Sequence, residues 1–399
     1  MWTRIMLSEK SIDNLIQPII DAQEQFEFKV LQKLAFRIRQ MSTLSYSAAM
    51  ALVRSLFSGE DIINIQKDLA ELSKVQIKRI DNVMRVVAKS IYEEAEVLYV
   101  YRKKPYLPLK KNKEICDLLL LLIDEIDDEY LGYINDPVFV IRQNSVATVK
   151  TAMPISTAYH SVLNEAAQTI QTGQDYNKTM ARTLDQLLDS GLRKVQRTES
   201  GKSKSIKVSD LIRTAILEKT KQLNTAMQAI MAGQFGADGI EISAHLNSAP
   251  DHEPVQGRQF LKEEFDKLQS YQAFQDIKKH KYEPIRRPIG AWNCRHWTKS
   301  IVIGVSVPEY TEKQLKEIEK RNAIGYTAPN GKHYTMYECT QLQRTYERNI
   351  ADYKQRYKIA KYADNSELQN KYFAKYSQFV NSYKAFSKAC GLPINQDKF

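Results

Sequence analysis

Two short segments, residues 243–257 and 292–297, hold residue types that could bind a metal. They contain three of the six histidines and one of the four cysteines of the chain. Cys294 and His296 are two residues apart, so in an extended chain their side chains point to the same side. Thiolate sulfur and imidazole nitrogen are natural zinc ligands. The segments therefore predict a candidate zinc site, although no paired C-x₂-C signature supports it. Its ligands would come from His245, His252, Cys294 and His296.

The same residues allow two other interpretations. The preferred one is structural: His245 and His252 hold turns in a loop-rich unit, and Gln256-Gly257 closes one of them. In the weaker one, Cys294 is a nucleophile that pairs with a histidine and Asp251. The sequence has no phosphate-binding loop, dinucleotide-binding fingerprint, nucleophile elbow or HExxH motif. We therefore expect neither an enzyme nor a cofactor, and zinc is the alternative.

Basic and aromatic residues alternate near the C-terminus. Residues 341–399 hold eleven Lys and Arg and five Asp and Glu, so +6 of the formal charge of +11 lies there. Such a surface could follow DNA phosphates. Tyr346, Tyr353 and Tyr357 also have the spacing of a packed helical face, which would leave the lysines in solvent, and the two interpretations are compatible. The candidate DNA contacts are Arg344, Arg348, Lys354, Arg356, Lys358, Lys361, Lys371 and Lys375.

Composition limits the class of protein. The chain has 399 residues, of which 43% are hydrophobic and 26% charged, as in soluble globular proteins, and wholesale disorder is excluded. This length suggests two or three domains. The longest aliphatic run, residues 118–123, is far shorter than a membrane span, and the first nine residues lack the apolar core of an export signal. Four widely spaced cysteines favour a reducing compartment over a disulfide framework.

Apolar spacing predicts helices over most of the N-terminal 235 residues. Residues 1–100 read as long helices that break at Ser58-Gly59, and a basic linker or extended arm follows at 101–108. Residues 138–141 fit either a strand or a helix. Further predicted helices cover 115–126, 157–172, 180–188 and a segment that Ser209 caps and that ends near Met231.

The amino-acid composition changes at Gly233, which predicts a small α+β unit after the helical region. Residues 236–307 contain four of the six His and two of the three Trp residues, together with several Gly and Pro residues and two strand-like runs, 240–243 and 301–305. After Pro308 the helical pattern returns, and Thr311 to Gln314 form a capping box for a helix that ends near Asn322. A hairpin around Pro329-Asn330-Gly331 and long helices over 337–389 follow.

The predicted fold class is thus mainly α with a small α+β domain and long helices at both ends. The predicted regions are a helical N-terminal region at 1–150, a helical region at 151–235, a compact loop-rich α+β unit at 236–307, and a hairpin with basic aromatic helices at 308–399.

Short motifs follow one another in order between Tyr159 and Pro393, and they include 242–245, 293–296 and 337–344. Together they resemble the phage minor capsid protein 2 family of tailed bacteriophages and prophages. The chain departs from the family pattern at Ala249-Pro250, where an Arg is usual, and at Val255, where an aromatic residue is common. Residues 1–150 carry no such motif. The most informative motif residues are Ser243, His245, His252, Gln256, Gly257, Asn293, Cys294, Arg295, His296, Tyr337, Glu338, Gln341 and Arg344.

The resemblance implies a minor head protein of a tailed phage, made in the cytoplasm of the bacterial host. Such a protein would lie inside the capsid near the portal and the packaged DNA, and act in head assembly, DNA packaging or ejection. Its expected partners are portal or major capsid protein, bound through the N-terminal half, and DNA. It could form an oligomer set by head symmetry. Two alternatives stay open: a virion-carried metal-dependent hydrolase or toxin-like effector, and an assembly factor absent from mature particles.

Overall fold

The computed structural model describes residues 9–41, 43–57, 60–135, 138–142, 150–172, 192–197, 203–269, 288–290, 294–396 and 399. Within them the chain is mainly helical with a few small antiparallel sheets, which confirms the predicted fold class. The predicted helix at 180–188 and the break at Ser58-Gly59 lie outside the described residues. No described helix is both long enough and apolar enough to cross a membrane.

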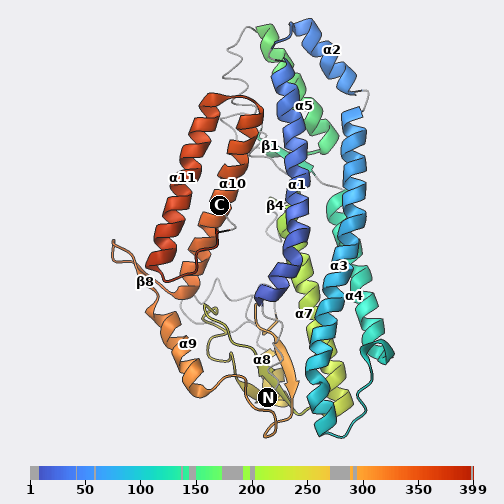
Figure 1. Cartoon of the computed structure of the whole chain (residues 1–399), viewed down its shortest axis with the longest axis vertical. Helices are drawn as coiled ribbons and strands as arrows, with labels where there is room; N and C mark the ends of the chain where they lie inside the picture. The colour runs from blue at the N-terminus through green and yellow to red at the C-terminus, as the bar shows by residue number, and fades with distance from the viewer. Residues whose placement is uncertain are drawn as a thin grey trace.

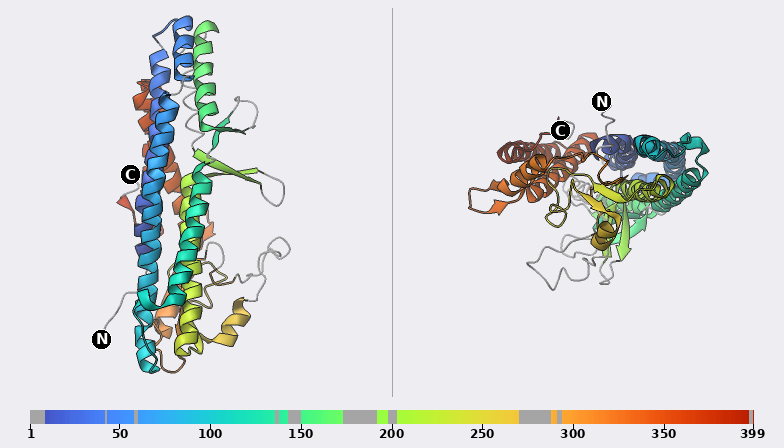
Figure 2. Two further views of the ribbon diagram at one scale, coloured as in Figure 1. Left: turned by 90° about the vertical axis from the view of Figure 1, so that its right-hand side faces the viewer. Right: turned by 90° about the horizontal axis from the view of Figure 1, so that it is seen from below.

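Four long helices run along the main axis of the molecule (Figures 1 and 2). They are α1 (Glu9–Met41), α3 (Glu60–Tyr101), α4 (Lys113–Asn135) and α7 (Val208–Phe235). The shorter α2 (Tyr46–Phe57) and α5 (Ile155–Thr172) pack together at the upper end in Figure 1. The apolar residues that recur every three or four positions face one another in a shared core. Fully buried members include Ile16, Ile19, Met84, Leu163 and Leu223.

The segment that follows α3 is an arm packed on the bundle. Tyr106 stacks on Tyr92 of α3 with 4.9 Å between ring centroids, and the Tyr92 hydroxyl donates to the Leu107 carbonyl over 2.7 Å. A short 3₁₀ turn, η1 (Leu109–Lys111), then leads into α4. The predicted helix at 115–126 is therefore the middle of a longer one.

A half-buried ion pair joins three helices at the upper end of the bundle. Arg37 of α1 donates to both carboxylate oxygens of Asp61 on α3, at 2.9 and 3.2 Å, and the Tyr159 hydroxyl of α5 donates to the same carboxylate over 2.9 Å. Burial alone would raise the pKa of Asp61, but the hydrogen bonds from Arg37 and Tyr159 outweigh it and lower the pKa. The ion pair therefore fixes the ends of α1, α3 and α5 relative to one another.

A half-buried acid in α4, Asp127, predicts that the stability of the fold depends on pH. Burial, together with the charges of Asp81, Asp124 and Asp128, raises the pKa of Asp127 to about 6, above the value of about 3.9 for an unfolded chain. This carboxyl therefore favours the folded state below about pH 4 and costs stability as the pH rises through 6. We expect Asp127→Asn to raise the free energy of unfolding at pH 7 by about 1 kcal/mol, since solvent screens a half-buried group.

Urea unfolding followed by circular dichroism at pH 4 and pH 7 checks this expectation. The difference in stability between the two pH values should shrink in the Asp127→Asn variant and stay unchanged in Asp117→Asn, which changes an exposed acid nearer the start of the same helix. An Asp127→Asn variant with the pH dependence of the parent chain would contradict it.

A four-stranded antiparallel sheet corrects the predicted helical region at 151–235. Its strands run in the order β2-β1-β3-β4. The sequence left 138–141 open between strand and helix, and it forms a strand. Strands β3 and β4 are rich in Lys, Arg and Ser and have no apolar run. Their local sequence therefore does not predict strands, which form because these segments pair with other strands of the sheet. The strands are β1 (Val138–Arg142), β2 (Lys150–Pro154), β3 (Leu192–Arg197) and β4 (Ser203–Lys207).

Two further local predictions are wrong. Ser209 does not cap α7: Lys207 occupies the cap position, and Ser209 is buried in the first turn. The apolar run at 301–305 is a strand only up to Ile301; the Val305 amide then donates back to the Val302 carbonyl in a turn, which Gly304 permits with a φ of +75°. In both cases the preceding strand already fixes the course of the chain.

The α+β unit lies at the foot of the bundle (Figure 1). Its antiparallel sheet has the order β6-β5-β7, formed by β6 (Gln259–Leu261), β5 (Gly239–Ile242) and β7 (Thr298–Ile301), followed on β6 by α8 (Lys262–Gln269). Gln228 of α7 accepts a hydrogen bond from the Ser300 amide over 2.7 Å, so the unit is tied to the bundle core.

The C-terminal part forms a helical hairpin beside α1. The predicted capping box at Thr311 opens α9 (Glu312–Ile324), and the predicted hairpin is β8 (Tyr326–Thr327) with β9 (His333–Tyr334). Helices α10 (Met336–Tyr362) and α11 (Ser366–Ala389) then pack antiparallel, and α10 also contacts α1. The long predicted helices at 337–389 are therefore confirmed, with a turn at 363–365.

Candidate functional site

Strand register brings the two His/Cys segments to one edge of the small sheet. Ile242 pairs with Thr298, so the loop that leaves β5 lies beside the residues that enter β7. The Ser243 amide donates to the Trp297 carbonyl and the Trp297 amide donates to the Ser243 hydroxyl, both over 2.9 Å, which continues this pairing. His252 sits in a tight turn of the first segment, where its amide donates to the Ala249 carbonyl.

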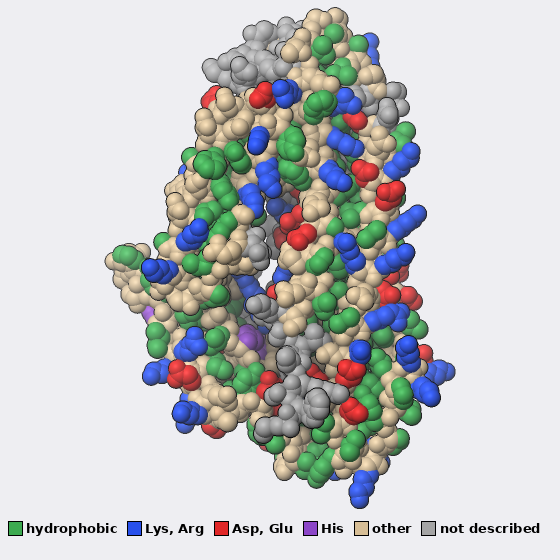
Figure 3. All heavy atoms as spheres, in the orientation of Figure 1, with side chains coloured by type: hydrophobic (Ala, Val, Ile, Leu, Met, Phe, Trp, Pro, Cys, Tyr) green, Lys and Arg blue, Asp and Glu red, His purple; other side chains and the backbone are tan. Residues whose placement is uncertain are grey.

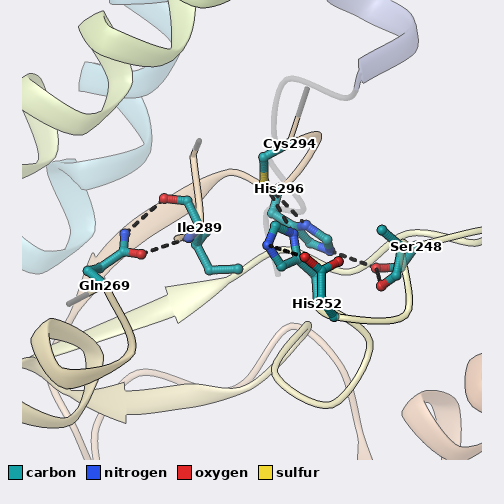
Figure 4. A network of polar contacts seen from close by, with 8 residues as sticks. Ser248, His252, Gln269, Ile289, Cys294 and His296 are labelled. Carbon is teal, nitrogen blue, oxygen red and sulfur yellow. Dashed lines mark hydrogen bonds and ion pairs between the residues drawn. The ribbon is translucent and has the colours of Figure 1, made fainter. Parts of the chain in front are cut away.

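Three of the four predicted zinc ligands meet in the interior (Figure 4). Cys294 Sγ lies 3.5 Å from His252 Nδ1 and 3.5 Å from His296 Nδ1. The three ligand atoms all lie within 4.8 Å of one another. The exposed fractions are 1% for His252, 2% for Cys294 and 3% for His296. The arrangement therefore presents one sulfur and two nitrogens to a common centre away from solvent.

His245 lies apart from this set of ligand atoms. Its ring packs on the ring of His296, with 4.4 Å between centroids and 32° between planes, and its Nδ1 faces the Leu246 carbonyl at 3.0 Å. The His245 amide donates to Gln256 Oε1 over 3.0 Å. His245 therefore packs against the cluster without joining the ligand atoms.

Polar groups surround the outer nitrogens of both histidines. His296 Nε2 lies 3.3 Å from Gln256 Oε1 and 3.4 Å from Ser248 Oγ, and His252 Nε2 lies 3.8 Å from Asp251 Oδ2. The sequence had indicated Gln256 as a turn residue and Asp251 as a partner of a nucleophile. It gave no sign of Ser248, whose side chain reaches the site only because the loop folds back on β7.

A small cavity beside His296 limits what can reach the cluster. Its volume is about 30 Å³, which is room for one water molecule. Gln269 of α8 closes one wall, since its amide binds both backbone groups of Ile289 at 2.7 and 2.8 Å. Cys294 is packed in a small apolar core with Ile242, Val255 and Ile289. The cluster is therefore placed for holding a small ion or for packing, and a substrate would need the unit to open.

The basic candidate residues on α10 and α11 divide into a half-buried group and an exposed group. Arg356 pairs with Asp352 at 2.9 Å and lies against the rings of Tyr353 and Tyr372, while Lys354 Nζ donates to the Phe399 carbonyl. These two side chains hold the hairpin together. Arg344 is half-buried. The remaining candidates are exposed: Arg348, Lys358, Lys361, Lys371 and Lys375.

The aromatic residues of the hairpin form its packed face. Tyr353 stacks on Phe379 with 5.4 Å between centroids, Tyr346 contacts Phe386 at 5.5 Å, and Tyr357 contacts Phe373 at 5.4 Å. This confirms the interpretation drawn from their helical spacing. The lysines around them are left on the outer surface.

A groove between α1 and α10 gathers three cations. Arg39 of α1 lines it together with Lys358 and Lys361 of α10, and the groove has a volume of about 490 Å³. Phe28 and Tyr362 form its apolar part, with Lys358 Nζ 5.7 Å from the centre of the Phe28 ring. The sequence indicated only the two lysines, because Phe28 and Arg39 lie more than 300 residues away along the chain.

Comparison with known proteins decides the family. A sequence model described as phage minor capsid protein 2 matches residues 7–387. The chain belongs to the phage minor capsid protein 2 family. The match includes the N-terminal 150 residues, in which no motif of the family was evident, and so extends the resemblance seen over 159–393 to nearly the whole chain. No curated protein and no solved structure matches it.

Several motif residues of this phage minor capsid protein have structural roles. Gly257 adopts a φ of +68°, and Ser243 pairs with the backbone of Trp297. Glu338 closes a capping box with Thr335 at the start of α10, a signal that the T-x-x-E spacing carried. Arg295 is half-buried, and Asn293 lies outside the described residues. Tyr337, Gln341 and Arg344 follow in the first turns of α10.

Proposed function

We propose that this phage minor capsid protein lies inside the capsid of a tailed phage, near the portal and the packaged DNA. There it would act in head assembly, DNA packaging or ejection. Family membership makes it a virion component. The observation that carries the DNA contact is the exposed basic surface of α10 and α11 with the groove that this hairpin forms against α1.

The groove has the chemistry of a phosphate-contacting surface. Lys358 and Lys361 are exposed, and Arg39 forms a salt bridge with Asp364 over 2.9 Å on the surface. An exposed pair of this kind contributes little and can exchange its carboxylate for a phosphate. Figure 3 shows this face hollowed between the hairpin and the long helices, with Lys and Arg side chains on both sides of the hollow. Such a surface attracts DNA without reading its sequence.

The end of α3 offers a surface for docking on portal or capsid protein. Val97 is 70% exposed, Val100 67% and Tyr101 53%, on the last turns of the helix. Large apolar side chains that stay in solvent on a helix are typical of the centre of a protein interface. This surface lies at the opposite end of α3 from the Arg37–Asp61 ion pair, in the region where the sequence analysis expected docking.

Counting this chain against portal and major capsid protein in purified DNA-filled particles tests the proposal. We expect a few to a few tens of copies per particle by quantitative mass spectrometry. We expect the double variant Val97→Glu/Val100→Glu to keep its thermal stability, because both side chains are exposed, and to fall at least about tenfold in incorporation, since each charge would be buried at an interface.

The matched control is Val75→Glu/Val86→Glu, which places the same two charges at other exposed sites of α3. Full incorporation of Val97→Glu/Val100→Glu would contradict docking through this surface. Presence of the parent chain in precursor particles and its absence from DNA-filled ones would overturn the virion location and favour an assembly factor.

A further inference from the structure

We propose that His252, Cys294 and His296 bind one zinc ion, and that this ion fastens the loop after β5 to the segment before β7. The inference concerns the folded chain itself and does not rest on the location proposed in the virion. It rests on the placement of three ligand atoms, on the groups behind them and on their burial.

The sulfur-to-nitrogen distances of the cluster fit a tetrahedral zinc site. With Zn–S of about 2.3 Å and Zn–N of about 2.0–2.1 Å, a sulfur and a nitrogen ligand at the tetrahedral angle lie about 3.5–3.6 Å apart. Both sulfur-to-nitrogen distances in the cluster are 3.5 Å. Hydrogen bonds could hold both contacts through the thiol proton and one Nδ1 proton, and a cation bound to the deprotonated sulfur and to both nitrogens would replace these two weak bonds by three metal–ligand bonds.

The groups behind the histidines match the tautomer that metal binding requires. If both Nδ1 atoms bind the ion, both Nε2 atoms carry a proton and need acceptors. Gln256 Oε1 stands 3.3 Å from His296 Nε2, and Asp251 Oδ2 stands 3.8 Å from His252 Nε2. Acceptors of this kind orient histidine ligands in metalloproteins and strengthen their binding. The same loop that supplies His252 therefore supplies an acceptor for His296 and places the Asp251 carboxylate near His252.

The donor set selects the class of metal. Thiolate and imidazole favour zinc over the oxygen-seeking Mg²⁺ and Ca²⁺. Three protein ligands leave a fourth position of the tetrahedron, which a water molecule could fill. Because all three ligands are buried and come from loop segments, we expect the ion to stabilise these loops. Residues 243–257 contain no described helix or strand, so a bound ion would hold in place a loop that no regular hydrogen-bond pattern stabilises.

The test uses the full chain purified without added chelator. We expect about one zinc per chain by elemental analysis, less than about 0.1 in Cys294→Ser, and full occupancy in the control Cys339→Ser, which changes another buried thiol. Replacing zinc by Co²⁺ should give the visible absorption of tetrahedral cobalt and a thiolate-to-cobalt band in the parent chain, and the thiolate band should be missing in Cys294→Ser.

A measurement on the parent chain covers the case in which the Cys294→Ser variant fails to fold. Chelation should remove the ion and lower the apparent melting temperature, and one equivalent of zinc should restore it. Less than about 0.1 zinc per parent chain together with no cobalt spectrum would overturn the proposal. So would zinc that remains in Cys294→Ser. All these readouts are independent of the assembly of particles.

Discussion

Replacing Gly257 by alanine is expected to lower the free energy of unfolding by about 3 kcal/mol. Gly257 has a φ of +68°, and a side chain in this left-handed region costs about 1–2 kcal/mol. A Cβ there would also lie 2.4 Å from Leu315 Cδ2 and 3.1 Å from Ala244 Cβ. Leu315 is buried, so it has little room to move away, and crowding of this kind adds about 1–3 kcal/mol.

The matched control is Gly236→Ala at the end of α7. Gly236 has a similar φ of +74°, but no described atom lies within 4 Å of its added Cβ. This variant should therefore lose only the backbone contribution, about 1 kcal/mol. Urea unfolding followed by circular dichroism compares the two. Equal losses would show that Leu315 and Ala244 adjust without cost and that the contact around Gly257 is looser than the structure indicates.

A close fit at Gly257 also has a consequence for the cluster. The residue directly follows Gln256, whose side chain accepts a hydrogen bond from the His245 amide and faces His296. Displacing the backbone at 257 therefore moves the acceptor behind one of the proposed zinc ligands. If the cluster binds zinc, Gly257→Ala should weaken zinc affinity, whereas Gly236→Ala should leave it unchanged.

The spacing of apolar residues was sufficient to predict the long helices, because each helix buries one face and that face is visible in its own sequence. The spacing of Ile12, Ile16 and Ile19 is visible in the sequence, and all three are fully buried. The capping box at Thr311 was equally local. Strands β3 and β4 were missed because their residues are mostly Lys, Arg, Gln and Ser, and their pairing partners are what makes them strands.

The candidate site shows the same division between residue type and placement. The sequence named His252, Cys294 and His296, since their chemistry is evident from type and spacing. It also named His245, and only the register between β5 and β7 with the turn at His252 shows that the His245 ring packs on its neighbour. Among the basic residues, type alone did not separate Arg356, which lies against two tyrosine rings, from the exposed Lys358.

The proposed contact with DNA predicts a large loss of DNA affinity when the lysines of the groove are replaced. We expect Lys358→Gln/Lys361→Gln to lower the affinity of the chain for duplex DNA by about 10–100-fold at about 0.1 M salt, because each phosphate contact releases counterions. The slope of log affinity against log salt should become shallower by about 2, at roughly 0.9 per lost contact. Fluorescence anisotropy with a labelled duplex over a range of salt concentrations measures both quantities.

The matched control is Lys313→Gln/Lys316→Gln, which removes the same charge from exposed positions of α9 away from the groove. It separates a local contact from a general attraction between a basic protein and DNA. If both double variants lose the same affinity, DNA responds to the net charge of the chain and the groove has no special role. Affinity that does not depend on salt would contradict phosphate contacts altogether, because a surface that neutralises phosphates must release counterions.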